Sequence, residues 1–224
     1  MTVGVYQLAL FAHLIFFCYW LGADLGVFYS AKFATDPKLT KDERRYVAKV
    51  MGFVDQFPRV SMLGTVATGA TLAIMGGNIK ADPSWLWLVW AIAIFWAGVV
   101  LYLYVNEADA AKIKPVKTAD FYARIVLLIL ILYAAITSFM GIGITDDRWL
   151  AAKFLALAGT SASGVTMRLV MRNFGPIYHA LLSGQATPEQ ARWVQKKMWT
   201  AKATVVCIWI FVASAAAIGL WKPF

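Results

Sequence analysis

The sequence predicts an all-α integral membrane protein, built as a bundle of six transmembrane helices in a single domain over residues 1–224. Hydrophobic residues make up 61% of the chain, and the mean hydropathy is +0.65, which is too high for a soluble domain of this length. A helix needs roughly 20 apolar residues to cross the hydrocarbon core of a bilayer. Six segments of that kind follow one another: 5–30, 58–77, 85–105, 122–143, 149–171 and 203–221.

Each segment carries features of its own. The first has no basic stretch before it and is too long for the apolar part of a cleaved signal sequence, so we expect it to stay in the mature protein. The fifth is rich in Ala, Gly, Ser and Thr, which is typical of a helix that packs against other helices rather than against lipid. Tryptophans mark the expected outer helix ends, as at membrane interfaces generally: Trp85, Trp87, Trp149 and Trp221.

The basic residues divide unequally between the connections. Seventeen lie in or beside three long connections: 31–57, 107–121 and 172–202. The two short connections, 78–84 and 144–148, hold only Lys80 and Arg148. By the positive-inside rule the long connections are cytoplasmic and both termini are periplasmic, as in a bacterial inner-membrane protein. The net charge of +9 therefore indicates topology and contact with lipid headgroups, and we expect no nucleic-acid partner.

Two of the basic connections resemble each other. In TKDERRYVAKVM (40–51) and TPEQARWVQKKM (187–198), Thr, Arg, an aromatic residue, Val, Lys and Met recur at a constant offset of 147. Each opens with the residues of a capping box, so we expect each to begin a short amphipathic helix along the headgroups. The similarity indicates a parallel internal repeat, in which the first two spans correspond to the last two. The alternative is that any basic membrane-surface helix uses the same few residue types.

The first span contains two ionisable residues inside its apolar run. His13, Phe17, Trp20 and Asp24 are spaced by four, three and four residues, which places all four on one stripe of a helix. Ionisable groups at such depth are costly unless they meet a partner or a cavity. Two interpretations of His13 stay open: a neutral imidazole hydrogen-bonded to another helix, or a cofactor ligand.

Asp24 is expected in the inner half of the membrane. We expect it to be charged and paired with Arg59 or Arg168, because an isolated carboxylate there would take up a proton.

Depth along the other helices predicts which side chains lie level with His13. Lys153 is about one turn inside the fifth span, and Met75 and Met140 lie near the outer ends of the second and fourth spans. The imidazole and the two thioethers suit Cu(I), which prefers soft ligands. His179 lies in a cytoplasmic connection and cannot join His13, which excludes a bis-histidine haem within one chain.

The same level also suits haem b. One axial imidazole in an apolar cleft between helices, with Phe17 and Trp20 as aromatic walls, is a common arrangement for haem, and Met, Lys or no side chain can occupy the second axial position.

Two stretches resemble a known family. The segment HLIFFCYW (13–20), followed by Phe28 and Tyr29, resembles the opening helix of HemJ-type protoporphyrinogen oxidases, and WLAAKFLALAG (149–159) resembles their later helix, where Trp-Leu is followed by Lys. CopD-like copper-resistance membrane proteins have a similar opening. The resemblance implies that His13 is a haem ligand and that Lys153 belongs to the same pocket.

The sequence therefore predicts a haem b-binding inner-membrane protein, HemJ-like or CopD-like, that acts in electron transfer or porphyrinogen oxidation. Cofactor-binding residues are expected to be His13, Phe17, Trp20 and Lys153, and no residue is assigned as catalytic. One alternative is a copper-handling permease. Another is a non-catalytic membrane subunit of a larger complex. The expected partners are the lipid bilayer and either a second copy of the chain or a membrane redox protein.

Overall fold

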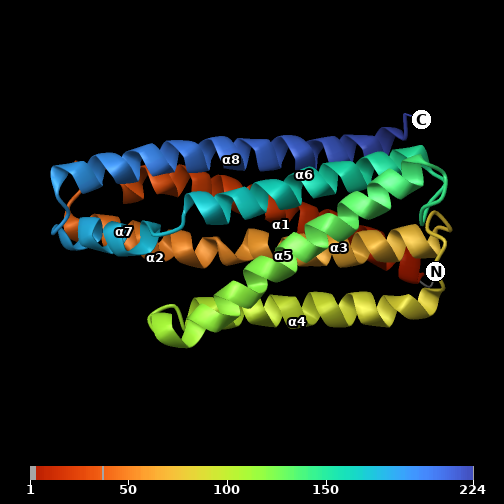
Figure 1. The fold of residues 1–224 in the computed structure, drawn as a ribbon, viewed down its shortest axis with the longest axis horizontal. Helices are drawn as coiled ribbons and strands as arrows, with labels where there is room; N and C mark the ends of the chain where they lie inside the picture. Colours follow the sequence, from red (N-terminus) through yellow and green to blue (C-terminus); the bar gives the residue numbers. More distant parts are fainter. Residues whose placement is uncertain (1–3, 37, 224) are drawn as a thin grey trace.

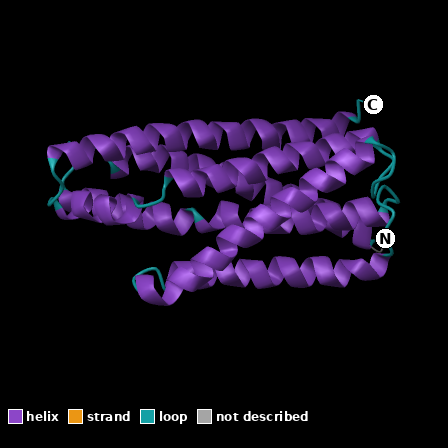
Figure 2. Cartoon of the chain, in the orientation of Figure 1, coloured by secondary structure: helices purple, strands orange, loops and turns teal. Residues whose placement is uncertain are grey.

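The computed structural model describes residues 4–36 and 38–223, and all regular structure in these ranges is helical (Figure 2). The elements are α1 (Val5–Ala34), α2 (Lys41–Val54), α3 (Gln56–Met75), η1 (Pro83–Trp85), α4 (Leu86–Val105), α5 (Ala110–Phe139), α6 (Arg148–Val170), α7 (Phe174–Ser183) and α8 (Pro188–Trp221). The predicted all-α bundle is confirmed.

Five helical segments are long and apolar enough to cross a membrane: α1, η1 with α4, α5, α6 and α8. The predicted six spans are therefore not all confirmed, because α3 is not among these five. Helix α3 has 20 residues, including Arg59 and several Thr and Gly residues, which lower its hydropathy. It also has the largest set of buried residues of any helix. A helix covered by protein on several sides needs less apolar surface than one that faces lipid.

The long helices form two groups (Figure 1). In one group α3 packs between α1 and α4, and in the other α6 packs between α5 and α8. Contacts between the groups are sparse and lie mainly along α1 with α8 and α4 with α5. The few polar contacts that join the two groups therefore bear strongly on how the bundle is held together.

Both termini and the two short loops lie at one end of the bundle, and the three basic connections lie toward the other (Figure 1). At the end with the termini, Lys80 donates to Asp146 at 2.6 Å and Asn78 donates to Asp147 at 2.7 Å. These bonds tie the α3–α4 loop to the α5–α6 loop. The separation of basic and non-basic connections along the bundle axis agrees with the predicted topology.

The two similar connections begin as predicted and then diverge. The capping boxes at Thr40 with Glu43 and at Thr187 with Gln190 are both formed. Helix α2 stops at Val54 and α3 begins two residues later, whereas α8 runs on without a break for 34 residues. The second predicted surface helix is thus the first part of a longer span. The internal repeat stays a prediction.

Candidate functional site

His13 lies in the third turn of α1 and faces α3. Its Nδ1 atom is 3.0 Å from Oγ1 of Thr68, a residue that is only 1% exposed. A Cβ atom added to Gly69 would lie 3.2 Å from Cε1 of the imidazole, so the ring packs directly over this glycine. The imidazole is therefore held between α1 and α3, with one nitrogen hydrogen-bonded.

The hydrogen bonds of Thr68 determine which imidazole nitrogen carries the proton. A hydroxyl has a single proton to donate, and Thr68 Oγ1 lies 2.6 Å from the carbonyl oxygen of Gly64, which can only accept. The hydroxyl proton is therefore directed at Gly64, and Thr68 accepts a bond from Nδ1–H of His13. In this tautomer Nε2 keeps its lone pair, which can bind a metal ion or a proton.

Lys153 places a positive charge toward the same end of the bundle. It lies in the second turn of α6, a helix that begins at the same end of the bundle as α1 (Figure 1). A Cβ atom on Gly219 of α8 would lie 2.7 Å from Nζ of Lys153. The ammonium therefore occupies the space next to Gly219 that any larger side chain would fill. Lys153 forms no ion pair with any residue that the structure describes. The group is positioned by packing and lacks a counter-ion within the described chain.

A second ammonium lies close to Lys153 at the end that carries the termini. Nζ of Lys222 lies 4.8 Å from the ring centroid of Trp149, and its charge acts on Lys153. The carboxylates nearest in sequence, Asp146 and Asp147, accept bonds from the α3–α4 loop instead. Neither cation forms an ion pair with a carboxylate of residues 4–36 and 38–223, and two such cations can bind an anionic group of a ligand.

The aromatic residues of the predicted stripe differ in their surroundings. Trp20 is buried at 7% exposure, and Phe17 is half-buried. The neighbouring ring of Phe16, which the stripe omits, packs onto α3, where a Cβ atom on Gly64 would lie 2.7 Å from the ring. Trp20 and Phe17 thus differ in burial, and the close approach of α1 to α3 depends on Phe16 and Gly64. A glycine in the middle of a helix was the available sequence signal for that contact.

The predicted methionine ligands are not enclosed. Met75 is the last residue of α3 and is 43% exposed, and Met140 follows the end of α5 and is 67% exposed. No group of three or more His, Cys, Asp or Glu side chains suited to a metal ion occurs within residues 4–36 and 38–223. His179 lies in α7, at the opposite end of the bundle from the loop that follows α3 (Figure 1). The structure thus places His13 and Lys153 toward the same end of the bundle, on α1 and α6, and leaves Met140 largely exposed.

The predicted ion pair of Asp24 with Arg59 or Arg168 is wrong. Oδ2 of Asp24 accepts a hydrogen bond from Nε1 of Trp209 at 2.8 Å. Arg59 pairs with Asp55, one helical turn before it, and Arg168 pairs with a carboxylate on α5. Asp55 is the nearer partner of Arg59 because residues four apart lie on the same face of a helix.

Sequence reasoning missed a second buried carboxylate, Asp120 of α5, which is 7% exposed. It accepts bonds from Arg124 at 2.9 Å, from Arg168 of α6 at 3.2 Å and from Nε1 of Trp96 of α4 at 2.7 Å. The guanidinium of Arg124 also lies 5.2 Å from the Trp96 ring centroid. The sequence signal was an Asp four residues before an Arg at the start of an apolar run. Asp120 joins three helices and is best understood as a structural centre.

Comparisons with protein-family models, with curated proteins and with solved structures found no match for this chain.

Proposed function

We propose that the protein binds haem b through Nε2 of His13 and works in electron transfer or porphyrinogen oxidation in a bacterial inner membrane. The observation that supports it most directly is the hydrogen bond between His13 and Thr68. Histidines that bind metals usually donate their other ring N–H to an oxygen, which fixes the tautomer and the ring orientation. The bond to Thr68 leaves Nε2 of the half-buried His13 as the ring nitrogen that can bind a metal ion.

The residues around His13 fit the group. Haem is a flat apolar macrocycle with two carboxylates, so it needs an axial ligand, apolar neighbours and a cation. His13 offers the ligand, Phe17 and Trp20 share its helix stripe, and Lys153 is a cation without a described partner. Bound haem would supply one-electron chemistry. The residues of this chain would fix its axial ligand, exclude water and compensate its charge.

Haem is favoured over copper by the surroundings of the methionines. A Cu(I) site would need His13 and two thioethers in one enclosed layer, yet Met140 is 67% exposed. Lys153 is also a poor neighbour for a bound cation, because like charges repel. A carboxylate-bearing cofactor turns the same lysine into a favourable contact.

The visible absorption spectrum of the purified protein tests the proposal. We expect a Soret band in the parent protein, its loss in His13→Ala, and its retention in His179→Ala, which removes the other, exposed histidine. A parent protein that stays without a chromophore after reconstitution with haem would contradict the proposal. Haem-loaded protein that turns porphyrinogen into fluorescent porphyrin, with an added quinone taking up the six electrons and six protons released, would favour oxidation over electron transfer alone.

Thr68→Val tests the tautomer argument separately. It removes the acceptor of the His13 N–H, and we expect haem affinity to fall by about 10- to 100-fold, the usual effect of losing such a partner. Thr160→Val is the matched control, because Thr160 is buried on α6 and its hydroxyl bonds only to Ala156 of its own helix. Equal losses in the two variants would show that the effect is general destabilisation.

A further inference from the structure

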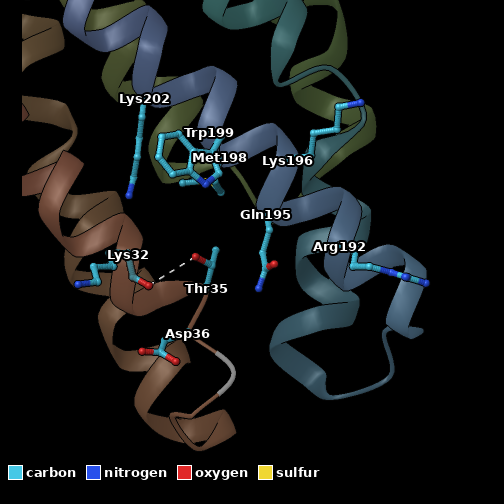
Figure 3. Close-up of a pocket in the computed structure, with 9 residues that line it drawn as sticks. All are labelled: Lys32, Thr35, Asp36, Arg192, Gln195, Lys196, Met198, Trp199 and Lys202. Atoms are coloured by element: carbon cyan, nitrogen blue, oxygen red, sulfur yellow. Dashed lines mark hydrogen bonds between the residues drawn. The ribbon is translucent and has the colours of Figure 1, made fainter.

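A cavity of about 610 Å³ lies between the end of α1 and the first turns of α8, at the end of the bundle that carries the basic connections (Figure 3). It forms because α1 packs on α3, and α8 packs on α6, with few contacts between α1 and α8 themselves. The cavity lies far along α1 from His13 and belongs to no part of the haem site.

The lining of the cavity is strongly basic. Lys32, Arg192, Lys196 and Lys202 are among its lining residues, together with a single carboxylate, Asp36. None of the four cations forms an ion pair with a residue in the described ranges. Oδ1 of Asp36 already accepts a backbone N–H two residues later, at 2.9 Å. The cavity therefore holds an excess of positive charge that nothing in the described chain compensates.

The side chains are arranged so that polar groups reach the gap from both helices. Figure 3 shows Lys202 and Gln195 extending from α8 toward α1, with Thr35 on the opposite wall, while Arg192 and Lys196 extend from the outer side of α8. The Thr35 hydroxyl donates to the Ala31 carbonyl at 3.0 Å. Lys and Gln supply donors from α8, which is the chemistry that a phosphate group requires.

The position along α8 matches the headgroup level of a membrane. Trp199 lines the cavity and is 78% exposed, and exposed tryptophans concentrate at the membrane interface. Nζ of Lys202 lies 5.4 Å from the ring centroid of Phe28 on α1, so this cation lies where aromatic and polar surroundings meet. Beyond Lys202, α8 continues as a strongly apolar span, along which an acyl chain can pack.

We propose that this cavity binds the headgroup phosphate of one anionic phospholipid, with Lys202 and Gln195 as donors and Arg192 and Lys196 as the surrounding charge. Basic pockets between transmembrane helices bind such headgroups, and each basic residue near the surface strengthens the attraction. The bound lipid fills the gap between α1 and α8 and joins the two helix groups at this end.

Native mass spectrometry of the full chain tests the proposal, with phosphatidylglycerol added to protein in neutral detergent. The cavity variant is Arg192→Gln, Lys196→Gln and Lys202→Gln. The matched control is Lys112→Gln, Lys114→Gln and Lys117→Gln, which removes the same charge from the first turns of α5. We expect the parent and the control to retain one phosphatidylglycerol, and the cavity variant to bind it at least about tenfold more weakly.

Further measurements distinguish a lipid phosphate from free phosphate and separate loss of binding from misfolding. Inorganic phosphate and phosphatidylcholine should neither bind nor displace the retained lipid, and Lys202→Gln alone should weaken it while Lys202→Arg restores it. Equal loss in the control variant would overturn the site, because it would show diffuse attraction to the whole basic end. Displacement by inorganic phosphate would overturn the lipid assignment.

Discussion

The indole Nε1 of Trp209 donates a hydrogen bond to Oδ2 of Asp24 at 2.8 Å, across 185 residues of sequence. It connects α8 to α1, which belong to different helix groups. A second bond of the same kind runs in the other direction, from Nε1 of Trp96 in α4 to Asp120 in α5 at 2.7 Å. Each helix group therefore contributes one tryptophan and one aspartate to these two bonds between helices of different groups.

The bond between Trp209 and Asp24 should be measurable as a coupling energy. We expect Trp209→Phe to lower the free energy of unfolding by about 1.5–3 kcal/mol, because it leaves a carboxylate without its donor. Asp24→Asn should cost less, since an amide oxygen can still accept the bond. A double-mutant cycle with Asp24→Leu, followed by thermal unfolding in detergent, measures the pair. Additive effects of Trp209→Phe and Asp24→Leu would show that the contact carries no energy.

Asp120 should be among the least replaceable residues of the bundle. Asp120→Ala leaves Arg124 and Arg168 without a counter-ion, and we expect a loss of about 3–5 kcal/mol in the free energy of unfolding. Asp146→Ala is the comparison. Its pair with Lys80 is exposed, at 72% for Asp146, so its loss should stay below about 1 kcal/mol. Similar losses in both variants would contradict the assignment of Asp120 as a structural centre.

The approach of α1 to α3 should depend on Gly64. A Cβ atom there would lie 2.7 Å from the ring of Phe16, so we expect Gly64→Ala to destabilise the protein by about 1–3 kcal/mol through overpacking. Gly22→Ala serves as control, because a Cβ at Gly22 meets no atom within 4 Å. It should be neutral or slightly stabilising, as alanine favours helix over glycine. If Gly64→Ala and Gly22→Ala changed the unfolding temperature by the same amount, the contact between Phe16 and Gly64 would be refuted.

Gly219 should control the position of the Lys153 ammonium. We expect Gly219→Ala and Lys153→Met both to weaken haem retention, without moving the Soret maximum, if the lysine meets a haem carboxylate and the axial ligand stays His13. A shifted maximum would instead make Lys153 the second axial ligand. Gly98→Ala on α4, where a Cβ meets nothing within 4 Å, should leave both retention and spectrum unchanged.

The topology can be read by labelling single cysteines. In a background with Cys18 and Cys207 replaced by serine, we expect Lys80→Cys to react with a membrane-impermeant maleimide from outside the cell and Lys41→Cys to react only after lysis. The reason is the 17-to-2 division of basic residues between the three long and the two short connections. Labelling of both positions from outside would overturn the assigned sides of the membrane and the status of α3 as a span.

The sequence alone determined the helical membrane class, the helix order and the division of charge between the ends of the bundle. These follow from local properties, because apolar length, capping residues such as Thr40 and Thr187, and basic connections act along the chain without regard to neighbours. That His13, Trp20 and Asp24 share one face of α1 also followed from spacing alone, since residues three and four apart lie on the same side of a helix.

Tertiary structure alone decided which partners those inward residues meet. Asp24 bonds to Trp209 rather than to an arginine, and Thr68 fixes the tautomer of His13, because lateral helix packing brings residues together that no sequence spacing relates. The close approach of the Lys153 ammonium to Gly219 also results from this lateral packing. The charges of α1, α3 and α6 could be ranked by depth from the sequence, but their angular positions around the bundle depend on how six helices fill space together.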